Sequence, residues 1–277
     1  MSYVFKTVDE LTFTDDFMFG TIMKNPEICK GVIERLLHIK VGKIEYPSLQ
    51  KTIAPFYESK GIRLDVYAAD DERTFDIEMQ TSTRPALAKR TRYYQSLMDV
   101  DNLLTGQGYD ELKESYVMFI CLTDPFKQDL PVYTFRNVCS ENNALFLDDK
   151  SYKVFYNASA YGREVNKELH AFLEYLCKKR ATSDFTKDID ELVETAKLNE
   201  QFRSTYMSLN IREYDLRREG RIEGEAIGFD RGRKDGLTEG ARQKALATAA
   251  LMKKENCAAD FIGRVTGLSE AEIAELS

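Results

Sequence analysis

The sequence predicts an α/β fold built around a mixed sheet, and three neighbouring segments carry this prediction. Residues 61–80, GIRLDVYAADDERTFDIEMQ, contain two alternating polar and apolar runs around a polar turn, which predicts a β-hairpin. Residues 85–106 follow with apolar side chains at helical spacing. Residues 116–122, YVMFICL, form the continuous apolar run of a strand buried on both faces. Strand, strand, helix and strand in this order indicate a mixed sheet covered by helices.

Helices and one strand are predicted before the hairpin. Residues 8–38 have apolar positions at helical spacing, and Thr14, Asp15 and Asp16 offer an N-terminal cap. Pro26 should divide this segment into two helices, because proline cannot continue a helix. A strand is expected within residues 41–55.

The helix after the hairpin is expected to begin with Pro85 in its first turn, where a missing amide hydrogen is tolerated. Tyr93 and Tyr94 should pack on the sheet, while Arg90 and Gln95 point outward. Further short strands that extend the sheet are predicted at residues 131–138, 143–147 and 152–159. Residues 165–210 have a helical pattern, and nothing in them suggests a catalytic or binding function.

Six glycines recur every four residues from Gly220 to Gly240. The segment is either a flexible linker or a helix, and a helix would lose about 1 kcal/mol per glycine relative to alanine. A period above 3.6 favours a right-handed wrap around a partner, and only glycine allows close backbone packing. We therefore expect an oligomerising helix and a homodimer or higher oligomer.

The C-terminal residues after this repeat predict a small helix-turn-helix-like module. A helix, a TGLS turn and a second helix follow one another, and Ser269 with Glu272 forms a capping box. Such a module either reads DNA or contacts protein. Its last helix carries acids and no base, which favours protein contact.

Composition is that of an ordinary globular protein, with 43% hydrophobic and 31% charged residues and a net charge of −7. No apolar run approaches the roughly 18 residues of a membrane helix, and the first residues lack the pattern of a signal peptide. A cytoplasmic protein without membrane association is therefore expected. Five scattered cysteines and two histidines argue against a disulfide framework, a structural zinc site and a histidine-rich metal site.

The candidate site lies on the hairpin. Strand alternation places Arg63, Asp65 and Tyr67 on one face and their apolar neighbours on the other, and it aligns Asp76, Glu78 and Gln80 on one face of the second strand. Asp65 and Glu78 should then lie side by side and repel each other unless a cation lies between them. Oxygen ligands at this spacing suit Mg²⁺, which assists phosphodiester cleavage. The alternative is a solvated strand face that carries acids for solubility.

Asp65 followed by Glu78-x-Gln80 resembles the PD-(D/E)XK nuclease signature, with Gln80 in place of the usual lysine. Over roughly residues 10 to 160, the chain is similar to the recombination-promoting nuclease (Rpn) or PD-(D/E)XK transposase-like family. The matching segments are TDDFMFGTIM (14–23), GIRLDVYA (61–68), DIEMQ (76–80), KRTRYYQSLMD (89–99), ESYVMFICLTDPF (114–126) and PVYTFRN (131–137). Leu64 stands where the signature has proline, and Gly20 stands where the family often has lysine.

The resemblance implies a restriction-endonuclease-like PD-(D/E)XK core, a mixed central sheet flanked by helices, with a C-terminal helical extension. It also implies a Mg²⁺-dependent DNA endonuclease tied to recombination or mobile elements, with Asp65, Glu78 and Gln80 as catalytic residues. Asp65, Glu78 and, by motif position, Asp16 are the implied metal ligands. Gln80 carries no charge, but its amide can orient water or donate to a phosphate oxygen. The alternative is a nuclease-fold interaction protein with weak or lost catalysis that acts through its C-terminal tail.

A basic window follows the metal strand, since no acid lies between Met79 and Met98. The residues expected to hold the DNA backbone in this window are Arg84, Lys89, Arg90 and Arg92, although a solvated helix face would have the same composition. The predicted parts of the chain are a nuclease-like core (1–164), a helical extension (165–210), the glycine-repeat segment (211–245) and the small C-terminal module (246–277).

Overall fold

The structure, a computed structural model, describes residues 5–44, 47–53, 61–82 and 85–276. The chain divides into two compact units, one that ends at Tyr206 and one that begins at Met207. Each unit is described separately below.

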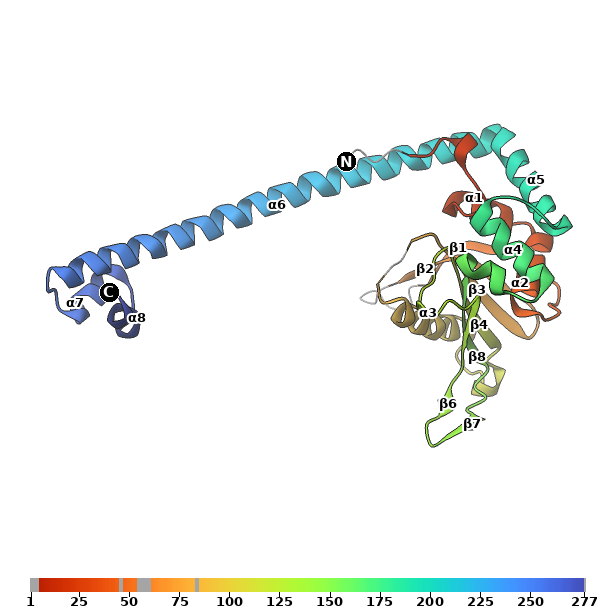
Figure 1. Ribbon diagram of the computed structural model, residues 1–277, viewed down its shortest axis with the longest axis horizontal. Coiled ribbons are helices and arrows are strands. Elements are labelled where there is room, and N and C mark those ends of the chain that lie inside the picture. Colours follow the sequence, from red (N-terminus) through yellow and green to blue (C-terminus); the bar gives the residue numbers. More distant parts are fainter. Residues whose placement is uncertain (1–4, 45–46, 54–60, 83–84, 277) are drawn as a thin grey trace. The chain divides into compact units, whose positions relative to one another are not determined.

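A six-stranded mixed sheet forms the centre of the first unit (Figure 1), so the predicted α/β fold is confirmed. The strand order is β1-β2-β3-β4-β8-β5. β2 is antiparallel to both of its neighbours, β1 and β3, and β5 is antiparallel to β8, whereas β3, β4 and β8 run parallel to one another. The bounds are β1 (Ser48–Ile53), β2 (Ile62–Ala69), β3 (Arg73–Gln80), β4 (Glu114–Cys121), β5 (Val132–Phe135) and β8 (Ser151–Asn157).

One face of the sheet is covered by four helices (Figure 1), which bury the larger of the hydrophobic clusters. They are α1 (Asp16–Met23), α2 (Pro26–Leu37), α4 (Lys167–Lys178) and α5 (Asp184–Leu198). Short 3₁₀ helices occupy Val8–Glu10, Tyr109–Glu111 and Ala158–Arg163. The predicted break at Pro26 is confirmed, because Pro26 is the first residue of α2 and the Asn25 side chain caps it.

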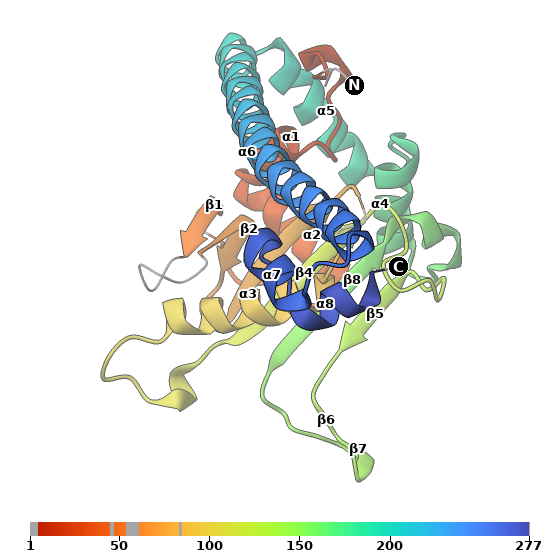
Figure 2. The ribbon, with the colours of Figure 1, turned by 90° about the vertical axis from the view of Figure 1, so that its left-hand side faces the viewer.

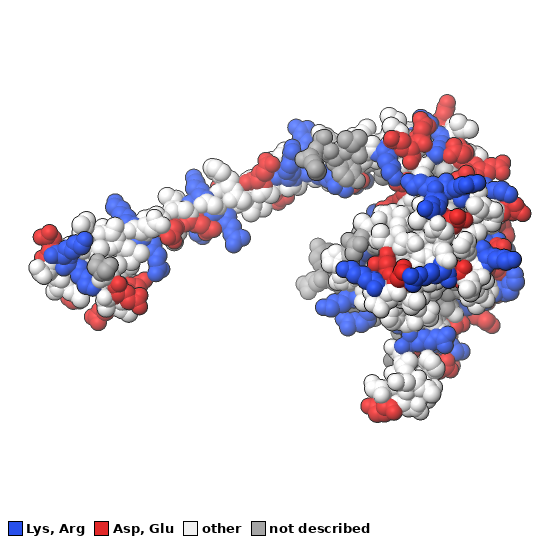
Figure 3. All heavy atoms as spheres, in the orientation of Figure 1, with Lys and Arg blue, Asp and Glu red and all other residues white. Residues whose placement is uncertain are grey.

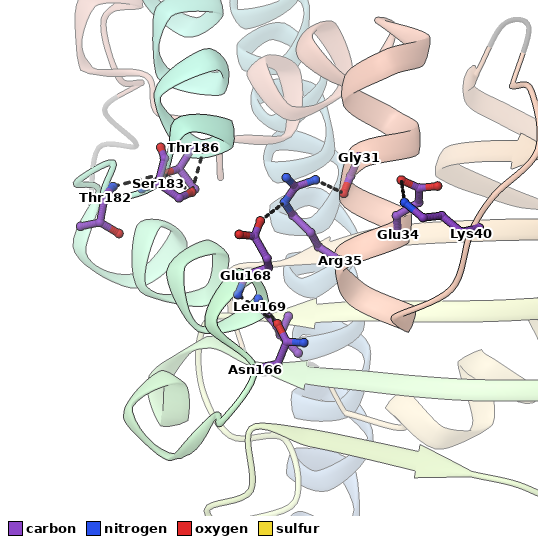
Figure 4. Close-up of polar contacts among 10 residues, drawn as sticks. All are labelled: Gly31, Glu34, Arg35, Lys40, Asn166, Glu168, Leu169, Thr182, Ser183 and Thr186. Atoms are coloured by element: carbon purple, nitrogen blue, oxygen red, sulfur yellow. Dashed lines mark hydrogen bonds and ion pairs between the residues drawn. The ribbon is translucent and has the colours of Figure 1, made fainter.

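Polar contacts fix the helices of this layer to one another (Figure 4). Arg35 of α2 donates to Glu168 at 3.1 Å and to the carbonyl of Gly31 at 3.0 Å. Asn166 accepts from the first amides of α4, and the Ser183 hydroxyl caps α5. The helix ends are thus satisfied by side chains, which fixes where each helix begins.

The other face of the sheet carries α3 (Leu87–Asn102), which packs over a second hydrophobic cluster with Leu97, Met98, Val117 and Phe119. The expectation that Pro85 lies in the first turn of this helix is wrong. Ala86, with a positive φ of 60°, is the residue before α3, so Pro85 belongs to the preceding turn.

A β-hairpin made of β6 (Val138–Cys139) and β7 (Asn142–Phe146) projects from the sheet (Figures 1 and 2). It forms a separate two-stranded sheet, so the prediction that residues 143–147 extend the central sheet is wrong. Every residue of β7 is exposed. β7 pairs instead with β6, which precedes it by only two residues in the chain, so a local hairpin takes the place of pairing with the sheet edge.

The second unit contains most of α6 (Glu200–Lys254), an unbroken helix of 55 residues, so the glycine repeat is helical. Two short helices, α7 (Ala259–Thr266) and α8 (Glu270–Glu275), pack against the last turns of α6 (Figure 1). The predicted turn is confirmed by Gly267, which has a φ of 74°. Ser269 and Glu272 form the predicted capping box. Among the described residues, no helix is both long and apolar enough to span a bilayer.

Candidate active site

The regular pairing of β2 is interrupted at Asp65. The pairs between β2 and β1 continue on both sides of this residue but omit it, and the pairs with β3 end at Val66. Across from Asp65 on β1, Gln50 has a positive φ of 49°. The sheet therefore opens at the position where the sequence predicts a catalytic acid.

The interruption also changes which side chains share a face. Ile62 and Leu64 pack with Tyr67 in the cluster beneath α3, whereas Val66 packs in the cluster on the opposite face. The prediction that Ile62, Leu64 and Val66 share one face is therefore wrong. A strict period of two holds only where strand pairing is regular, and it is not regular at Asp65.

At this opening, side-chain carboxylates take the place of backbone hydrogen bonds. The backbone N–H of Asp65 donates to Glu78 Oε1 at 2.9 Å, and the N–H of Met79 donates to Asp65 Oδ2 at 3.3 Å. Each acid thus lies against the other acid's strand. The structure brings Asp65 and Glu78 together, as the two strand patterns predicted.

Arg90 of α3 points into this site. Its guanidinium donates to Glu78 Oε2 at 3.2 Å and to Gln80 Oε1 at 3.1 Å, and it lies over the ring of Phe119. The expectation that Arg90 and Gln95 point outward is wrong, because Gln95 is buried as well. The physical reason is the side chain of Glu78, which is only 5% exposed and needs a counter-charge.

Gln80 ends β3 beside the two acids. Its Nε2 donates to the carbonyl of Ser82 at 2.6 Å, while its Oε1 accepts from Arg90. Both ends of the amide are therefore held, and the orientation of the side chain is fixed. A preorganised amide is what orients a water or a phosphate oxygen.

The charge of Asp65 is unfavourable as the site stands. Burial first and the nearby carboxylate of Asp16 next raise its pKa to about 6, against the lowering effects of the Met79 amide and of Arg63 and Arg90. Asp16 is exposed at the first position of α1. The structure therefore places Asp16 within electrostatic reach of Asp65.

Asp76 is a residue of this site that the sequence prediction missed. It lies two residues before Glu78 on β3 and is 0% exposed, and neither of its carboxylate oxygens has a hydrogen-bond partner among the described residues. Burial raises its pKa well above the usual range, and Glu78 and Asp65 act in the same direction. Alternation already aligned Asp76 with Glu78 and Gln80, so a polar residue on an inward face was the available signal.

The donor chemistry fits a hard divalent cation. Within the described parts of the chain, no three Asp, Glu, His or Cys side chains lie close enough together to hold a metal ion. Asp65 and Glu78 nevertheless present carboxylate oxygens from adjacent strands, with the charge of Asp16 nearby, and Mg²⁺ is typically bound through one or two carboxylates. A cation there would relieve the repulsion that raises the pKa of Asp65.

The other three residues predicted to hold DNA are Arg84, which precedes α3 in the sequence, and Lys89 and Arg92 on α3. Lys89 and Arg92 are exposed, as a surface that contacts DNA requires. Arg84 lies outside the described residues. Of the four cations predicted to hold DNA, only Arg90 is directed toward the acids in the described structure.

The comparisons with known proteins agree with this geometry. Neither a curated protein nor a solved structure matches the chain. The profile of one family, PD-(D/E)XK nuclease family transposase, matches residues 13–215, well over half of the chain. The matched span includes the strands that carry Asp65 and Glu78 and the helix that carries Arg90. Membership indicates a nuclease or transposase-related function, in the class of hydrolases acting on nucleic acids. The chain belongs to the PD-(D/E)XK nuclease family of transposases.

Proposed function

We propose that this chain is a metal-dependent DNA endonuclease that hydrolyses phosphodiester bonds and serves recombination or mobile elements. The observation that carries the proposal is the pair of hydrogen bonds at the opening of the sheet, in which Glu78 accepts from the Asp65 amide and Asp65 accepts from the Met79 amide. A carboxylate pair placed where two strands separate is costly for the fold, because both charges lose hydration. Such a cost is typical of residues kept for function.

Asp65 and Glu78 would hold a divalent cation, Mg²⁺ being the expected one, and the nearby carboxylate of Asp16 would move in to complete the ligand set when the cation binds. When bound, the cation supplies positive charge that stabilises the negative charge gathering on the attacked phosphate. The backbone amides of Asp65 and Met79 hold the two carboxylates through hydrogen bonds, so the oxygens that would bind the metal are positioned before any ligand arrives. The raised pKa of Asp65 supports this role, since a group that repels its neighbours gains most from a cation.

Gln80 would position the attacking water or the scissile phosphate. It cannot act as a base, so its contribution is orientation and hydrogen bonding. Its Oε1 accepts from Arg90 and its Nε2 donates to the Ser82 carbonyl, so the amide is oriented before a phosphate enters. Of Gln80 and Arg90, only Arg90 carries a charge, and it would turn from Glu78 toward the phosphate.

The exposed Lys89 and Arg92, together with Arg84, would hold the DNA backbone beside the acids. They follow the metal strand along the chain, and Lys89 and Arg92 lie on the same helix as Arg90. Contacts of this kind position a duplex without reading its sequence.

Cleavage of supercoiled plasmid DNA tests the proposal. The native protein should nick or linearise the plasmid with Mg²⁺ or Mn²⁺ and leave it intact with EDTA, while Asp65→Ala and Glu78→Ala should abolish cleavage. Glu72→Ala is the matched control, since Glu72 is an exposed acid in the turn of the same hairpin. If Asp65→Ala and Glu78→Ala cut like the native protein, the assigned site is wrong.

The alternative function is an interaction protein that keeps the nuclease fold with weak or lost catalysis. The exposed apolar side chains of α6 favour it, since large exposed apolar surfaces mark sites of protein contact. A native protein that binds DNA in the same assay but cuts with neither metal would support this alternative.

A further inference from the structure

One side of α6 carries large apolar residues in its first half. Each residue of an α-helix advances the chain by about 100°, so positions three or four apart share a face. On this face lie Ile211, Tyr214, Ile222 and Phe229, which are 62%, 54%, 54% and 72% exposed, with the charged Arg218 and Glu225 between them. We call this side the free face of α6.

The same free face carries small residues in the second half of the helix. Continuing at steps of three or four residues, it reaches Gly232, Gly236, Gly240, Ala247 and Ala250. The combined spacing from Ile211 to Ala250 averages about 3.6 residues, the period of a straight helix. The glycine repeat taken alone predicted a right-handed wrap, but the whole free face runs almost straight along α6.

The described chain gives no reason for these glycines. A Cβ added at Gly232, Gly236 or Gly240 would meet nothing within 4 Å. Glycine is also the poorest helix former after proline, so the helix by itself would be more stable with alanine at each position. The requirement for small residues therefore points to something outside the described chain that approaches the backbone.

The small C-terminal helices do not cover the free face. The core that α7 and α8 share with α6 is formed by Ala249, Ile262 and Ile273. Gln243 and Ala247, on the free face, remain exposed beside this core. Ala250 is half-buried, so the free face stays open as far as Ala247.

The two halves of the free face complement each other when one helix is turned end to end. In an antiparallel pair, Phe229 lies opposite the partner's Gly232, Ile222 opposite the partner's Gly240, and Tyr214 opposite the partner's Ala247. The large apolar side chains of each helix then meet small residues of the partner, while Glu225 meets Gly236 and Arg218 meets Gln243 at the two remaining steps. A parallel pair would place large against large and small against small. Because the distance between packed helices depends on the side chains between them, two straight helices could not satisfy both halves.

Charges beside the free face are compatible with the same register. Glu219 and Lys244 lie along one edge, while Arg221 and Glu239 lie along the other. In an antiparallel pair, each edge of one helix faces the same edge of the partner helix. Glu219 therefore meets the partner's Lys244, and Arg221 meets the partner's Glu239. Figure 3 shows that basic and acidic side chains are interspersed along α6. Opposite charges would also meet in a parallel pair, so the direction rests on the sizes of the side chains.

We propose that α6 docks a second copy of this chain in antiparallel orientation, with the bulky half of each free face against the glycine and alanine half of the other. The pairing uses no residue of the candidate active site and does not depend on the proposed catalysis. It assigns Gly232, Gly236 and Gly240, the second half of the glycine repeat, a steric function, which is to let the partner helix approach closely.

Sedimentation velocity and light scattering on the full chain test the association. The native protein should be a dimer at about ten micromolar, within the affinity range of ordinary specific complexes. Gly236→Leu should weaken the dimer about tenfold or more, because a bulky residue there overpacks the contact, even though leucine favours the helix more than glycine does. Gly220→Leu is the matched control, since Gly220 lies on nearly the opposite side of α6 and should leave the dimer intact.

Circular dichroism on the same samples separates loss of contact from loss of fold. Helix content should be unchanged or higher in Gly236→Leu while the dimer weakens. A native protein that is monomeric at about a hundred micromolar would overturn the proposal. Equal dimer strength in Gly236→Leu and the native chain would overturn it as well.

Cysteine cross-linking tests the direction. The background protein carries Cys139→Ala, Cys177→Ala and Cys257→Ala, which leaves only the two buried cysteines, Cys29 and Cys121. Single Arg218→Cys and Gln243→Cys variants are added to it, because positions 218 and 243 face each other in the antiparallel register.

Mixing these two variants should give a disulfide between position 218 of one chain and position 243 of the other, since facing Cα atoms must lie within about 7 Å for the bond to form. Each variant alone should give none. Self-cross-linking of either variant would show a parallel pair and overturn the antiparallel assignment.

Discussion

Asp65→Asn should stabilise the fold at neutral pH and abolish cleavage. The pKa of the Asp65 carboxyl rises from 3.8 to about 6 through burial first and the charge of Asp16 next. The folded chain therefore holds the Asp65 proton more tightly than the unfolded chain does. The free energy of unfolding falls as pH rises through the interval between these two values, and the cost is complete above about pH 6.

A shift of this size corresponds to roughly 3 kcal/mol, since one pKa unit is about 1.4 kcal/mol. Asparagine removes the charge but can still accept from the Met79 amide, so the hydrogen bond that Asp65 makes is kept. We expect Asp65→Asn to raise the free energy of unfolding by up to about 3 kcal/mol at about pH 7.5. The difference from the native chain should disappear near pH 4.

Urea unfolding of both proteins across this pH range measures the effect, without added divalent cation. Asp71→Asn is the control, because Asp71 is an exposed acid in the turn of the same hairpin. The reasoning is refuted if Asp65→Asn is less stable than the native chain at about pH 7.5, or if the difference between them does not change with pH.

Three further outcomes follow from the site. Gln80→Ala should slow plasmid cleavage by about 10²-fold or more, as expected for loss of a preorganised polar group, while Gln80→Lys should keep activity. Native cleavage rates for Gln80→Ala under saturating Mg²⁺ would show that Gln80 has no catalytic role. Arg92→Gln should weaken binding to all DNA sequences and lower the salt dependence by about one phosphate contact, and unchanged binding across a salt series would return Arg92 to a solvated face. Asp76→Asn should raise the urea midpoint at neutral pH, because it removes a buried carboxylate whose oxygens have no partner among the described residues, and a lower midpoint would show that the charge is compensated.

Much of the fold could be predicted because it is specified locally. The turn between β2 and β3 lies between two alternating runs, and the buried strand β4 is a continuous apolar segment. The cap at Asn25 with Pro26 and the capping box at Ser269 depend on only a few neighbouring residues. Local patterns of this kind are what a sequence displays directly.

The features that were mispredicted depend on distant parts of the chain. The Arg90 side chain points inward because Glu78, 12 residues earlier in the chain, is buried and needs a counter-charge. The face change at Asp65 arises because β1 and β3 both lose their pairing there. Period counting along one strand contains neither piece of information.

The candidate site was predictable in its two central acids and less so around them. Asp65 and Glu78 follow from alternation on adjacent strands, and the family signature adds Gln80. The burial of Asp76 and the direction of Arg90 depend on how α3 covers the sheet, which no local pattern specifies. The straight free face of α6 was not predicted, because the glycine repeat has a period of four residues and the apolar and alanine positions of the same helix face do not follow that period.

Direct measurement of Mn²⁺ binding by electron paramagnetic resonance tests the central claim, that the Asp65–Glu78 pair holds a divalent cation. Titration of the native protein should show bound Mn²⁺ that Mg²⁺ displaces, and Glu78→Gln should lose this binding while its circular dichroism spectrum stays native. Glu72→Gln, the exposed acid of the same hairpin, should bind like the native protein. Equal Mn²⁺ binding by Glu78→Gln and the native chain, or no binding by either, would contradict the account.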